Sequence, residues 1–195
     1  LGSGGFGRVY LCKDIEQQKE VAIKVLLPVN EDDPKARERF EKEARRTINL
    51  DHENIIDVKD FGYDDKGIPY IVMEYLPGTL GELLEETKNI DSEKVNSFAI
   101  DLCDALIYAH GQTDEPIVHR DINPNNIMFT ENDVIKLCDF GIARPIDYLT
   151  GSLIAGSYKY SPYEQWQGKT DVRSDIYSLG VVLYELLTGN TPFDA

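Results

Sequence analysis

Alternating apolar and polar residues predict that the first third of the chain is rich in β-strands. Residues 8–14 alternate as a half-buried strand does, and residues 20–27 repeat the strand pattern after a polar turn. Residues 55–63 and 68–75 flank the turn sequence Asp-Asp-Lys-Gly and therefore predict a hairpin.

One helix is predicted among these strands. Pro34 suits the first turn of a helix, and apolar Ala36, Phe40, Ala44 and Ile48 recur every four residues after it. This spacing puts the four side chains in one stripe, so the helix is expected to present a single apolar face to the strands.

The pattern changes at residues 76–79, Leu-Pro-Gly-Thr, where proline and glycine predict a hinge. Beyond it the chain becomes mainly helical, and Ser92 can cap a helix that continues to about Ala109. The predicted apolar face of this helix consists of Val95, Phe98, Ala99, Leu102, Ala105, Leu106 and Ala109.

Short strands and a final helix complete the pattern. Residues 127–129 and 134–138 are apolar enough for two strands, and residues 139–170 are rich in loop-forming residues. The last helix is predicted over 174–188 with Gly189 as its end, and it is apolar nearly all round, which predicts burial.

Composition limits the partners. The chain has 195 residues, enough for one domain or two small lobes, and its 20 Lys plus Arg against 35 Asp plus Glu give a net charge of −15. This charge argues against binding nucleic acid or an anionic membrane over the whole surface. Solubility explains the acidity most simply, and a preference for basic protein substrates is the alternative.

The cysteines and the chain ends bear on localisation. Cys12, Cys103 and Cys138 lie far apart with no metal-ligand spacing, which favours a reducing, cytoplasmic setting. No signal peptide is expected from the first residues, and the apolar stretch 176–187 is too short to span a bilayer. Both ends are expected to be cut, so the chain could also be the cytosolic part of a membrane-anchored protein.

Three glycines open the chain in G-x-G-x-x-G spacing. Gly2, Gly4 and Gly7 would let backbone N–H groups approach phosphate oxygens closely. The same spacing opens a dinucleotide-binding fold, but that fold requires a helix directly after the glycines. A strand pattern that includes Val9 follows here instead, which disfavours that fold.

A lysine and an acid suggest how phosphates would be held. Lys24 lies within an apolar strand in the sequence Val-Ala-Ile-Lys, which matches a lysine that grips phosphates. Such a lysine needs an acid to position it, and Glu43 on the predicted helix is the candidate. Alternatively, Glu43 is one more charge on the solvated face of that helix.

The sequence His-Arg-Asp-Ile-Asn-Pro-Asn-Asn spans residues 119–126. Asp121 is followed five residues later by Asn126, a spacing that suits a catalytic base beside a metal ligand. Asp139, at a predicted strand end and before Phe-Gly, could also hold Mg²⁺, which takes few protein ligands.

These motifs, in this order and spacing, resemble the eukaryotic-type (Hanks-type) serine/threonine protein kinase catalytic domain over nearly the whole chain. The resemblance implies an α+β, bilobal fold with a β-rich N-lobe that carries one main helix and a mainly helical, C-terminally incomplete C-lobe. The expected lobes are residues 1–76 and 77–195.

The resemblance also implies functional residues. Asp121 would be the catalytic base, aided by Lys24, Glu43 and Asn126, and Mg²⁺ would be held by Asn126 and Asp139. Met73 would be the gatekeeper, with the hinge at 74–76. The implied ATP-binding residues are Leu1, Gly2, Gly4, Gly7, Val9, Ala22, Lys24, Met73, Glu74, Leu76 and Asp139.

Three further positions carry implied roles. Asp175 would brace the catalytic loop, and Cys138 would lie on the floor of the ATP site or simply pack there. Arg120 would receive a phosphate carried by Thr150 or Ser152.

The chain departs from the family pattern in three ways. Asn123 stands where serine/threonine kinases carry a lysine that touches the γ-phosphate. The family's Ala/Ser-Pro-Glu sequence is replaced by Pro162-Tyr163-Glu164, and the later helices that supply the arginine partner of this glutamate do not follow.

The leading hypothesis is an ATP- and Mg²⁺-dependent kinase that acts on Ser/Thr hydroxyls of protein substrates and is slowed by Asn123. Ser157 in Gly-Ser-Tyr-Lys-Tyr supports the serine/threonine class. The alternative is a pseudokinase that serves as a nucleotide-binding or scaffold module. A small-molecule kinase is disfavoured by the activation segment, which the resemblance places between Asp139 and Glu164, and by the helix around Asp175.

Overall fold

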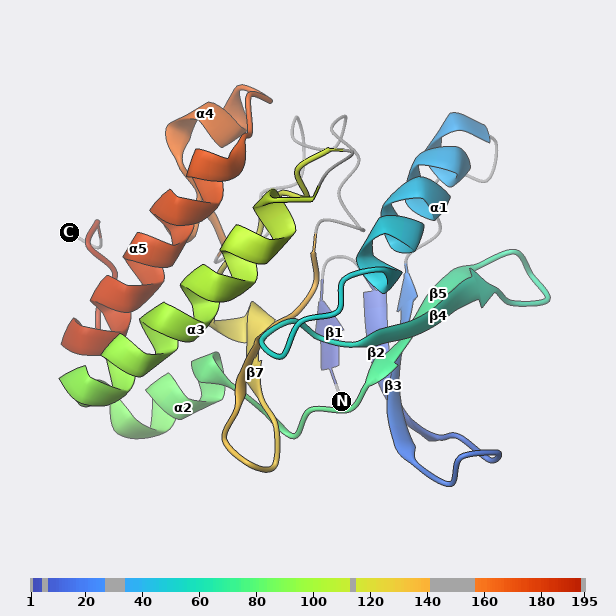
Figure 1. The fold of residues 1–195 in the computed structure, drawn as a ribbon, viewed down its shortest axis with the longest axis horizontal. Helices are drawn as coiled ribbons and strands as arrows, with labels where there is room; N and C mark the ends of the chain where they lie inside the picture. The colour runs from blue at the N-terminus through green and yellow to red at the C-terminus, as the bar shows by residue number, and fades with distance from the viewer. Residues whose placement is uncertain (1, 5–6, 27–33, 113–114, 141–156, 194–195) are drawn as a thin grey trace.

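The strand-rich first third of the chain forms one antiparallel sheet (Figure 1). The structure is a computed structural model that describes residues 2–4, 7–26, 34–112, 115–140 and 157–193. The strand order is β1-β2-β3-β5-β4, and every neighbouring pair is antiparallel. The strands are β1 (Gly2–Gly4), β2 (Gly7–Lys13), β3 (Glu20–Leu26), β4 (Val58–Tyr63) and β5 (Pro69–Glu74).

Helix α1 (Pro34–Ile48) lies beside this sheet (Figure 1). Its predicted apolar stripe holds for Ala44, which is fully buried, and for Ile48, which packs against the sheet's core. The side chains of Ala36 and Phe40 lie outside the described part of the chain. The buried residues of this N-terminal cluster are Ala22, Leu26, Ala44, Ile56, Val58, Ile71, Met73, Leu76 and Cys138.

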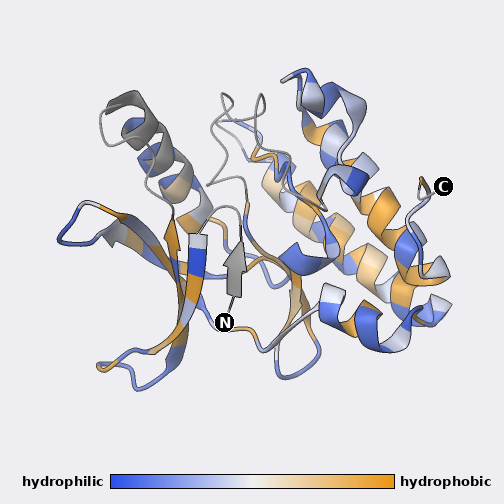
Figure 2. Cartoon of the chain, turned by 180° about the vertical axis from the view of Figure 1, so that it is seen from behind, coloured by the Kyte–Doolittle hydropathy of each residue, from blue (hydrophilic) through white to orange (hydrophobic). Residues whose placement is uncertain are grey.

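The second part of the chain is mainly helical, with a three-stranded sheet in the order β6-β7-β8. Helices α3 and α5 pack together, and Figure 2 shows apolar residues along both of them. The elements are β6 (Gly78–Thr79), α2 (Leu80–Thr87), α3 (Ser92–His110), η1 (Pro124–Asn126), β7 (Ile127–Phe129), β8 (Ile135–Leu137), η3 (Ser157–Tyr160), α4 (Tyr163–Trp166) and α5 (Val172–Thr188).

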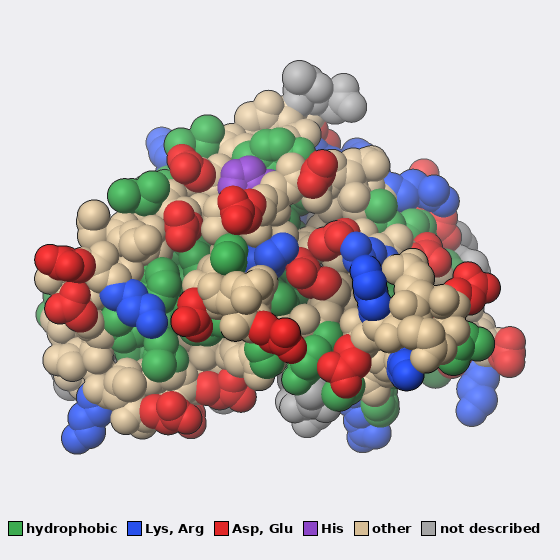
Figure 3. Space-filling model, turned by 60° about the horizontal axis from the view of Figure 1, so that its bottom comes forward, with side chains coloured by type: hydrophobic (Ala, Val, Ile, Leu, Met, Phe, Trp, Pro, Cys, Tyr) green, Lys and Arg blue, Asp and Glu red, His purple; other side chains and the backbone are tan. Residues whose placement is uncertain are grey.

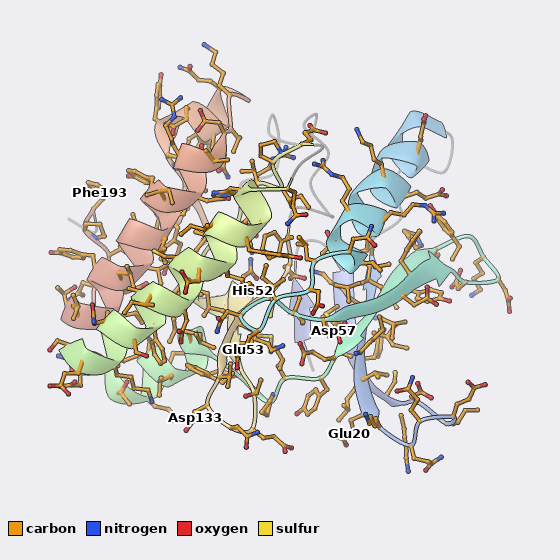
Figure 4. The ribbon with its side chains drawn as sticks, viewed as in Figure 1. Glu20, His52, Glu53, Asp57, Asp133 and Phe193 are labelled. Carbon is orange, nitrogen blue, oxygen red and sulfur yellow. The ribbon has the colours of Figure 1, made fainter. Side chains whose placement is uncertain are left out.

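The segment between α1 and β4 joins the two parts. Leu50 and Ile55 belong to the core around α3 and α5. The Ile56 N–H donates to the Leu137 carbonyl at 2.9 Å, and the Leu137 N–H donates to the Asn54 carbonyl at 2.9 Å. His52, labelled in Figure 4, stacks at a tilt on Tyr108 of α3, with ring centroids 5.2 Å apart. This segment therefore attaches the base of α1 to the helical part.

The α+β fold with a strand-rich first part and a helical second part is confirmed, but some helix bounds were wrong. The N-cap of α3 is Asp91, whose side chain accepts from the Glu93 N–H, so Ser92 is already helical. Helix α5 begins at Val172, two residues earlier than expected, because Asp171 caps it. Gly189 ends α5 in the left-handed conformation, as predicted.

Two larger features also differ from the expectation. Helix α2 was not singled out; Thr79 starts it with a capping box, in which Thr79 and Glu82 bond each other's backbone N–H. Helix α5 is buried on one face only, because Ile176 and Tyr184 are about half exposed on the other, at 54% and 48%. None of the described helices is long and apolar enough to cross a membrane.

Candidate active site

Asp175 of α5 holds the start of the loop at residues 119–126, the catalytic loop. Its two carboxylate oxygens accept the backbone N–H groups of His119 and Arg120, each at 2.8 Å. His110, at the end of α3, places Nε2 2.8 Å from the same carboxylate. Asp175 is only 1% exposed, so these bonds form away from water. The predicted bracing of the catalytic loop by Asp175 is confirmed.

His119 continues this bonding inside the loop. The fully buried ring donates from Nε2 to the Cys138 carbonyl at 2.8 Å, because a carbonyl can only accept. The opposite nitrogen, Nδ1, accepts the Asp121 N–H at 3.2 Å. The ring thus ties the predicted base to the residue that precedes Asp139, a role that no local sequence pattern predicted.

Two asparagines hold the other side of Asp121. The Asp121 carbonyl accepts from Asn126 Nδ2 at 2.8 Å and from Asn123 Nδ2 at 3.0 Å. Because Asn126 donates through its nitrogen, its side-chain oxygen remains as an acceptor, which is the atom a metal ion would need. The donor set therefore fits a Mg²⁺ ligand at this position.

Asn123 is packed into the loop. It is 5% exposed, its Nδ2 bonds Asp121, and its Oδ1 accepts the Asn125 N–H at 3.0 Å as the cap of η1. The sequence placed Asn123 where a lysine would reach the γ-phosphate, whereas the structure directs its amide toward the backbone of its own loop.

Lys24 and Asp139 meet across 115 residues of chain. Lys24 Nζ lies 2.6 Å from Asp139 Oδ2, and Lys24 is buried at 8% exposure. Asp139 has φ of 63°, a left-handed conformation that is uncommon for residues other than glycine and often marks functional sites. The structure thus brings together the two residues expected to handle phosphates and metal.

The neighbouring backbone places Asp139 beside the catalytic loop. The N–H of Cys138 donates to the Asn126 carbonyl at 2.9 Å. Among the described residues, no three His, Cys, Asp or Glu side chains gather as a metal site. The backbone bond from Cys138 brings Asn126 and Asp139, the two predicted Mg²⁺ ligands, close together, and their role as ligands stays a prediction. The side chain of Glu43 lies outside the described part of the chain, and its pairing with Lys24 stays a prediction.

Four of the apolar residues expected to contact ATP lie in or against the N-terminal cluster: Val9, Ala22, Met73 and Leu76. In the sheet, Val9 pairs with Lys24, and Ala22, two residues before the lysine on β3, pairs with Met73. Met128 of β7 packs against the same cluster and was missed. Its position two residues after Asn126 was the available signal. Leu1 lies outside the described residues.

Among the glycines of the first motif, Gly7 has a structural requirement of its own. It has φ of 155°, and a Cβ there would lie 2.2 Å from the Val25 carbonyl oxygen. Gly2 and Gly4 lie in β1, which pairs with β2. The close approach of β2 to β3 therefore requires glycine at this position whether or not a phosphate binds above it.

Glu74, in the predicted hinge, contacts both parts of the molecule. Its Oε1 accepts from Lys136 Nζ at 2.7 Å and from the Asp57 N–H at 2.8 Å. The side chain is thus held by β8 and by the segment before β4, which includes Asp57, labelled in Figure 4. Lys136 was another residue the sequence analysis missed, because nothing local connects it to the hinge.

Cys138 lies at the boundary between the site and the core. It is 4% exposed, and burial raises the pKa of its thiol well above the usual range, with the charges of Asp139 and Glu74 raising it further. The residue is therefore a neutral thiol that packs in the N-terminal cluster.

The end of the activation segment is anchored to α5. The hydroxyl of Tyr160 bonds Glu185 Oε2 at 2.6 Å, and Ser174 Oγ lies 3.5 Å from Glu164. Thr150 and Ser152, the predicted phosphate acceptors, lie outside the described residues.

Comparisons with known proteins agree with this geometry. The family described as "Protein kinase domain" matches residues 1–195. A probable serine/threonine-protein kinase of Clostridium acetobutylicum is 40% identical over 100% of this chain and 30% of its own length. The serine/threonine-protein kinases PknB of Mycolicibacterium smegmatis and PrkC of Bacillus subtilis are both 39% identical, over 99% and 100% of this chain and 32% and 30% of their own lengths.

The chain thus spans about a third of the length of the curated relatives it matches. The match covers every motif described above, from the glycines to α5. The chain belongs to the protein kinase family, and the relatives it resembles are serine/threonine-protein kinases.

Proposed function

We propose that this chain transfers the γ-phosphoryl group of Mg·ATP to Ser or Thr hydroxyls of protein substrates. The observation that carries the proposal is the ion pair of Lys24 with Asp139, 2.6 Å apart, beside a loop whose backbone positions Asp121. Phosphoryl transfer depends mainly on positioning and on charge stabilisation, and these residues supply both.

Each residue then has a defined task. Lys24, positioned by Glu43, binds phosphate oxygens, while the apolar side chains around it hold the adenine. Asp121 accepts the proton of the substrate hydroxyl. The hydroxyl oxygen bonds to the γ-phosphorus at the same time as the bond between that phosphorus and ADP breaks. Mg²⁺ held by Asn126 and Asp139 would neutralise charge on the phosphate oxygens.

We further propose that transfer is slow because Asn123 replaces a cation. Its amide is committed to the loop backbone, and the next basic residue after Asp121 is Lys136, which pairs with Glu74. A neutral amide cannot offset the charge on the transferring group. Lys159, at the end of the activation segment, is the alternative source of that charge.

Protein substrates and ATP are the proposed partners, and the lobes 1–76 and 77–195 are proposed to bind ATP between them. Figure 3 shows one face on which acidic side chains are scattered among single basic ones, consistent with the net charge of −15 and against a nucleic-acid surface there. The cytoplasmic setting inferred from the separate cysteines is kept as part of this proposal.

The test is phosphate transfer from labelled ATP by the complete protein, to itself or to a protein substrate. Asp139→Asn should abolish Mg²⁺-dependent transfer because it removes the charged ligand. Phosphoamino-acid analysis should find phosphoserine or phosphothreonine. Transfer by Asp139→Asn at the wild-type rate would show that the site is assigned wrongly, and ATP binding without any transfer would favour the pseudokinase.

A further inference from the structure

Gln165 of α4 is buried against the catalytic loop, although no motif of the sequence analysis includes it. It is 4% exposed, and its Nε2 donates to the Arg120 carbonyl at 2.8 Å. The same nitrogen lies 3.3 Å from Ser161 Oγ. The side chain therefore crosses from the end of the activation segment to the residue that directly precedes Asp121.

The orientation of the Gln165 amide follows from its partner. The carbonyl oxygen of Arg120 can only accept a hydrogen bond, so the NH₂ group must face it. Turning the amide over would place two acceptor oxygens against each other.

The bond from Gln165 helps to fix the orientation of the peptide group between Arg120 and Asp121. Arg120 has φ of 66°, in the left-handed region, where few residues other than glycine are stable without support. The peptide group between Arg120 and Asp121 is bonded at both of its polar atoms. The Asp121 N–H donates to His119 Nδ1, and the Arg120 carbonyl accepts from Gln165 Nε2. The peptide plane is thus held from both sides, and its rotation would turn Asp121 away from its position.

The other half of the Gln165 amide indicates why an amide is present. Its Oε1 is buried and has no hydrogen-bond partner within the described ranges of the chain. Burying an unsatisfied acceptor costs free energy, and an apolar side chain of the same length would fill the space without that cost. The NH₂ group that bonds Arg120 offsets the cost and accounts for the amide.

We propose that Gln165 is a positioning residue for Asp121, which it orients by holding the Arg120 carbonyl from the activation-segment side. The inference rests on the proposed function, because positioning affects the rate only if Asp121 is the catalytic base. In this role Gln165 would act through the Arg120 carbonyl and not by contact with ATP or the substrate hydroxyl.

The decisive variant is Gln165→Glu, which keeps the size and replaces the donor with an acceptor. In the complete protein, we expect kcat to fall about 10- to 100-fold, because small displacements of a catalytic group have effects of that size. The KM for ATP should be unchanged. Gln167→Glu is the matched control: it introduces the same charge on the exposed residue just after α4, and it should leave kcat at the wild-type value.

A pH profile separates positioning from packing. At lower pH the new carboxyl of Gln165→Glu becomes protonated and can donate to the Arg120 carbonyl, so its kcat relative to wild type should rise as pH falls. Gln165→Met lacks any donor and should show a constant deficit across the same range. An unchanged kcat in Gln165→Glu, or a deficit that is equal in both variants and constant with pH, would overturn the proposal.

Amide hydrogen exchange keeps this test independent of the proposed function. If wild-type protein transfers no phosphate, the proposed function fails, but the bond can still be tested. Faster exchange at the Asp121 amide in Gln165→Glu than in Gln167→Glu would support the positioning of the loop. Equal exchange in the two variants would contradict it.

Discussion

The catalytic loop and the Lys24–Asp139 pair are two sides of one site, yet different interactions hold them. The loop is fixed by buried or partly buried hydrogen bonds between its backbone and four side chains. Asp175 and His119 accept from backbone N–H groups, whereas Asn126 and Gln165 donate to backbone carbonyls. On the other side, one ion pair joins the sheet to Asp139.

This difference has a physical consequence. Buried hydrogen bonds to backbone groups are costly to break because each leaves an unsatisfied donor or acceptor. An ion pair with a partly exposed carboxylate contributes little to stability, since water can replace it, although its charge acts strongly on a phosphate. We therefore expect substitutions in the loop support to lower stability and substitutions in the ion pair to lower the reaction rate.

Asp175→Ala should have the largest effect. It removes the acceptor of two backbone N–H groups and the partner of His110 in a buried setting, so we expect the free energy of unfolding to fall by about 3–5 kcal/mol. Urea denaturation followed by circular dichroism measures this loss. The control is Asp171→Ala at the N-cap of the same helix, where the side chain is 43% exposed; it should lose much less, because only a helix cap is removed. Equal losses in the two variants would mean that α5, not the loop, responds.

Lys24→Met should show the opposite behaviour. Removing the ammonium group should lower the rate of transfer by about 100-fold or more, as is typical when one charge-stabilising donor is lost. The stability should change by less than about 1 kcal/mol, because Asp139 is partly exposed and can be hydrated. Lys19→Met, in the exposed turn before β3, should change neither quantity. A large loss of stability in Lys24→Met would remove the contrast between the two sides.

Asn123→Lys sharpens the comparison at the point where the two sides meet. A cation in the loop should raise kcat by about tenfold to a few hundredfold, because hydrogen bonds to charged groups contribute about 1.5–3 kcal/mol. The KM should fall by a smaller factor. The variant should also lose about 1 kcal/mol of stability, since the amide caps η1.

The competing interpretation of Asn123 has its own variant. If Lys159 already supplies the charge, Asn123→Lys should be neutral or harmful, and Lys159→Ala should remove most of the activity. Steady-state kinetics of both variants distinguish the two cases. Absence of transfer in wild type and in Asn123→Lys would contradict both and leave the pseudokinase.

Asp101→Asn should have the smallest effect on the free energy of unfolding, and this effect should depend on pH. Partial burial raises the pKa of this α3 carboxyl, and the charges of Glu53 and Asp104 raise it further. At neutral pH the charged carboxylate therefore destabilises the fold, and Asp101→Asn should stabilise it by about 0.5 kcal/mol or less. The gain should shrink as pH falls through the raised pKa and vanish below the unfolded value of about 3.9, where Asp101 is protonated in both states.

Thermal unfolding at several pH values measures this change. Asp65→Asn, in the exposed turn between β4 and β5, is the control and should show no such trend. A gain from Asp101→Asn that stays constant down to pH 4 would contradict the electrostatic cause. Because Glu53 comes from the segment that joins α1 to β4, this repulsion acts where the sheet meets the helices (Figure 4).

The sequence by itself determined the features that depend on neighbours along the chain. Strand patterns identified the strands that carry Lys24 and Met73, and the spacing of three or four residues identified α3. A nearly continuous apolar stretch identified α5. The motif order indicated the kinase family and named Asp121, Asn126 and Asp139. Helix α2 was missed because its eight residues carry too short an apolar pattern to recognise.

Only the tertiary structure decided which distant groups meet. The bond from Gln165 to Arg120 spans 45 residues and that from Lys136 to Glu74 spans 62, and no local pattern predicts either. The direction of the Asn123 amide was likewise set by its surroundings. Periodicity records which face of an element is apolar, whereas the pairing of buried polar groups depends on how the elements pack, because each such group must find its partner in space.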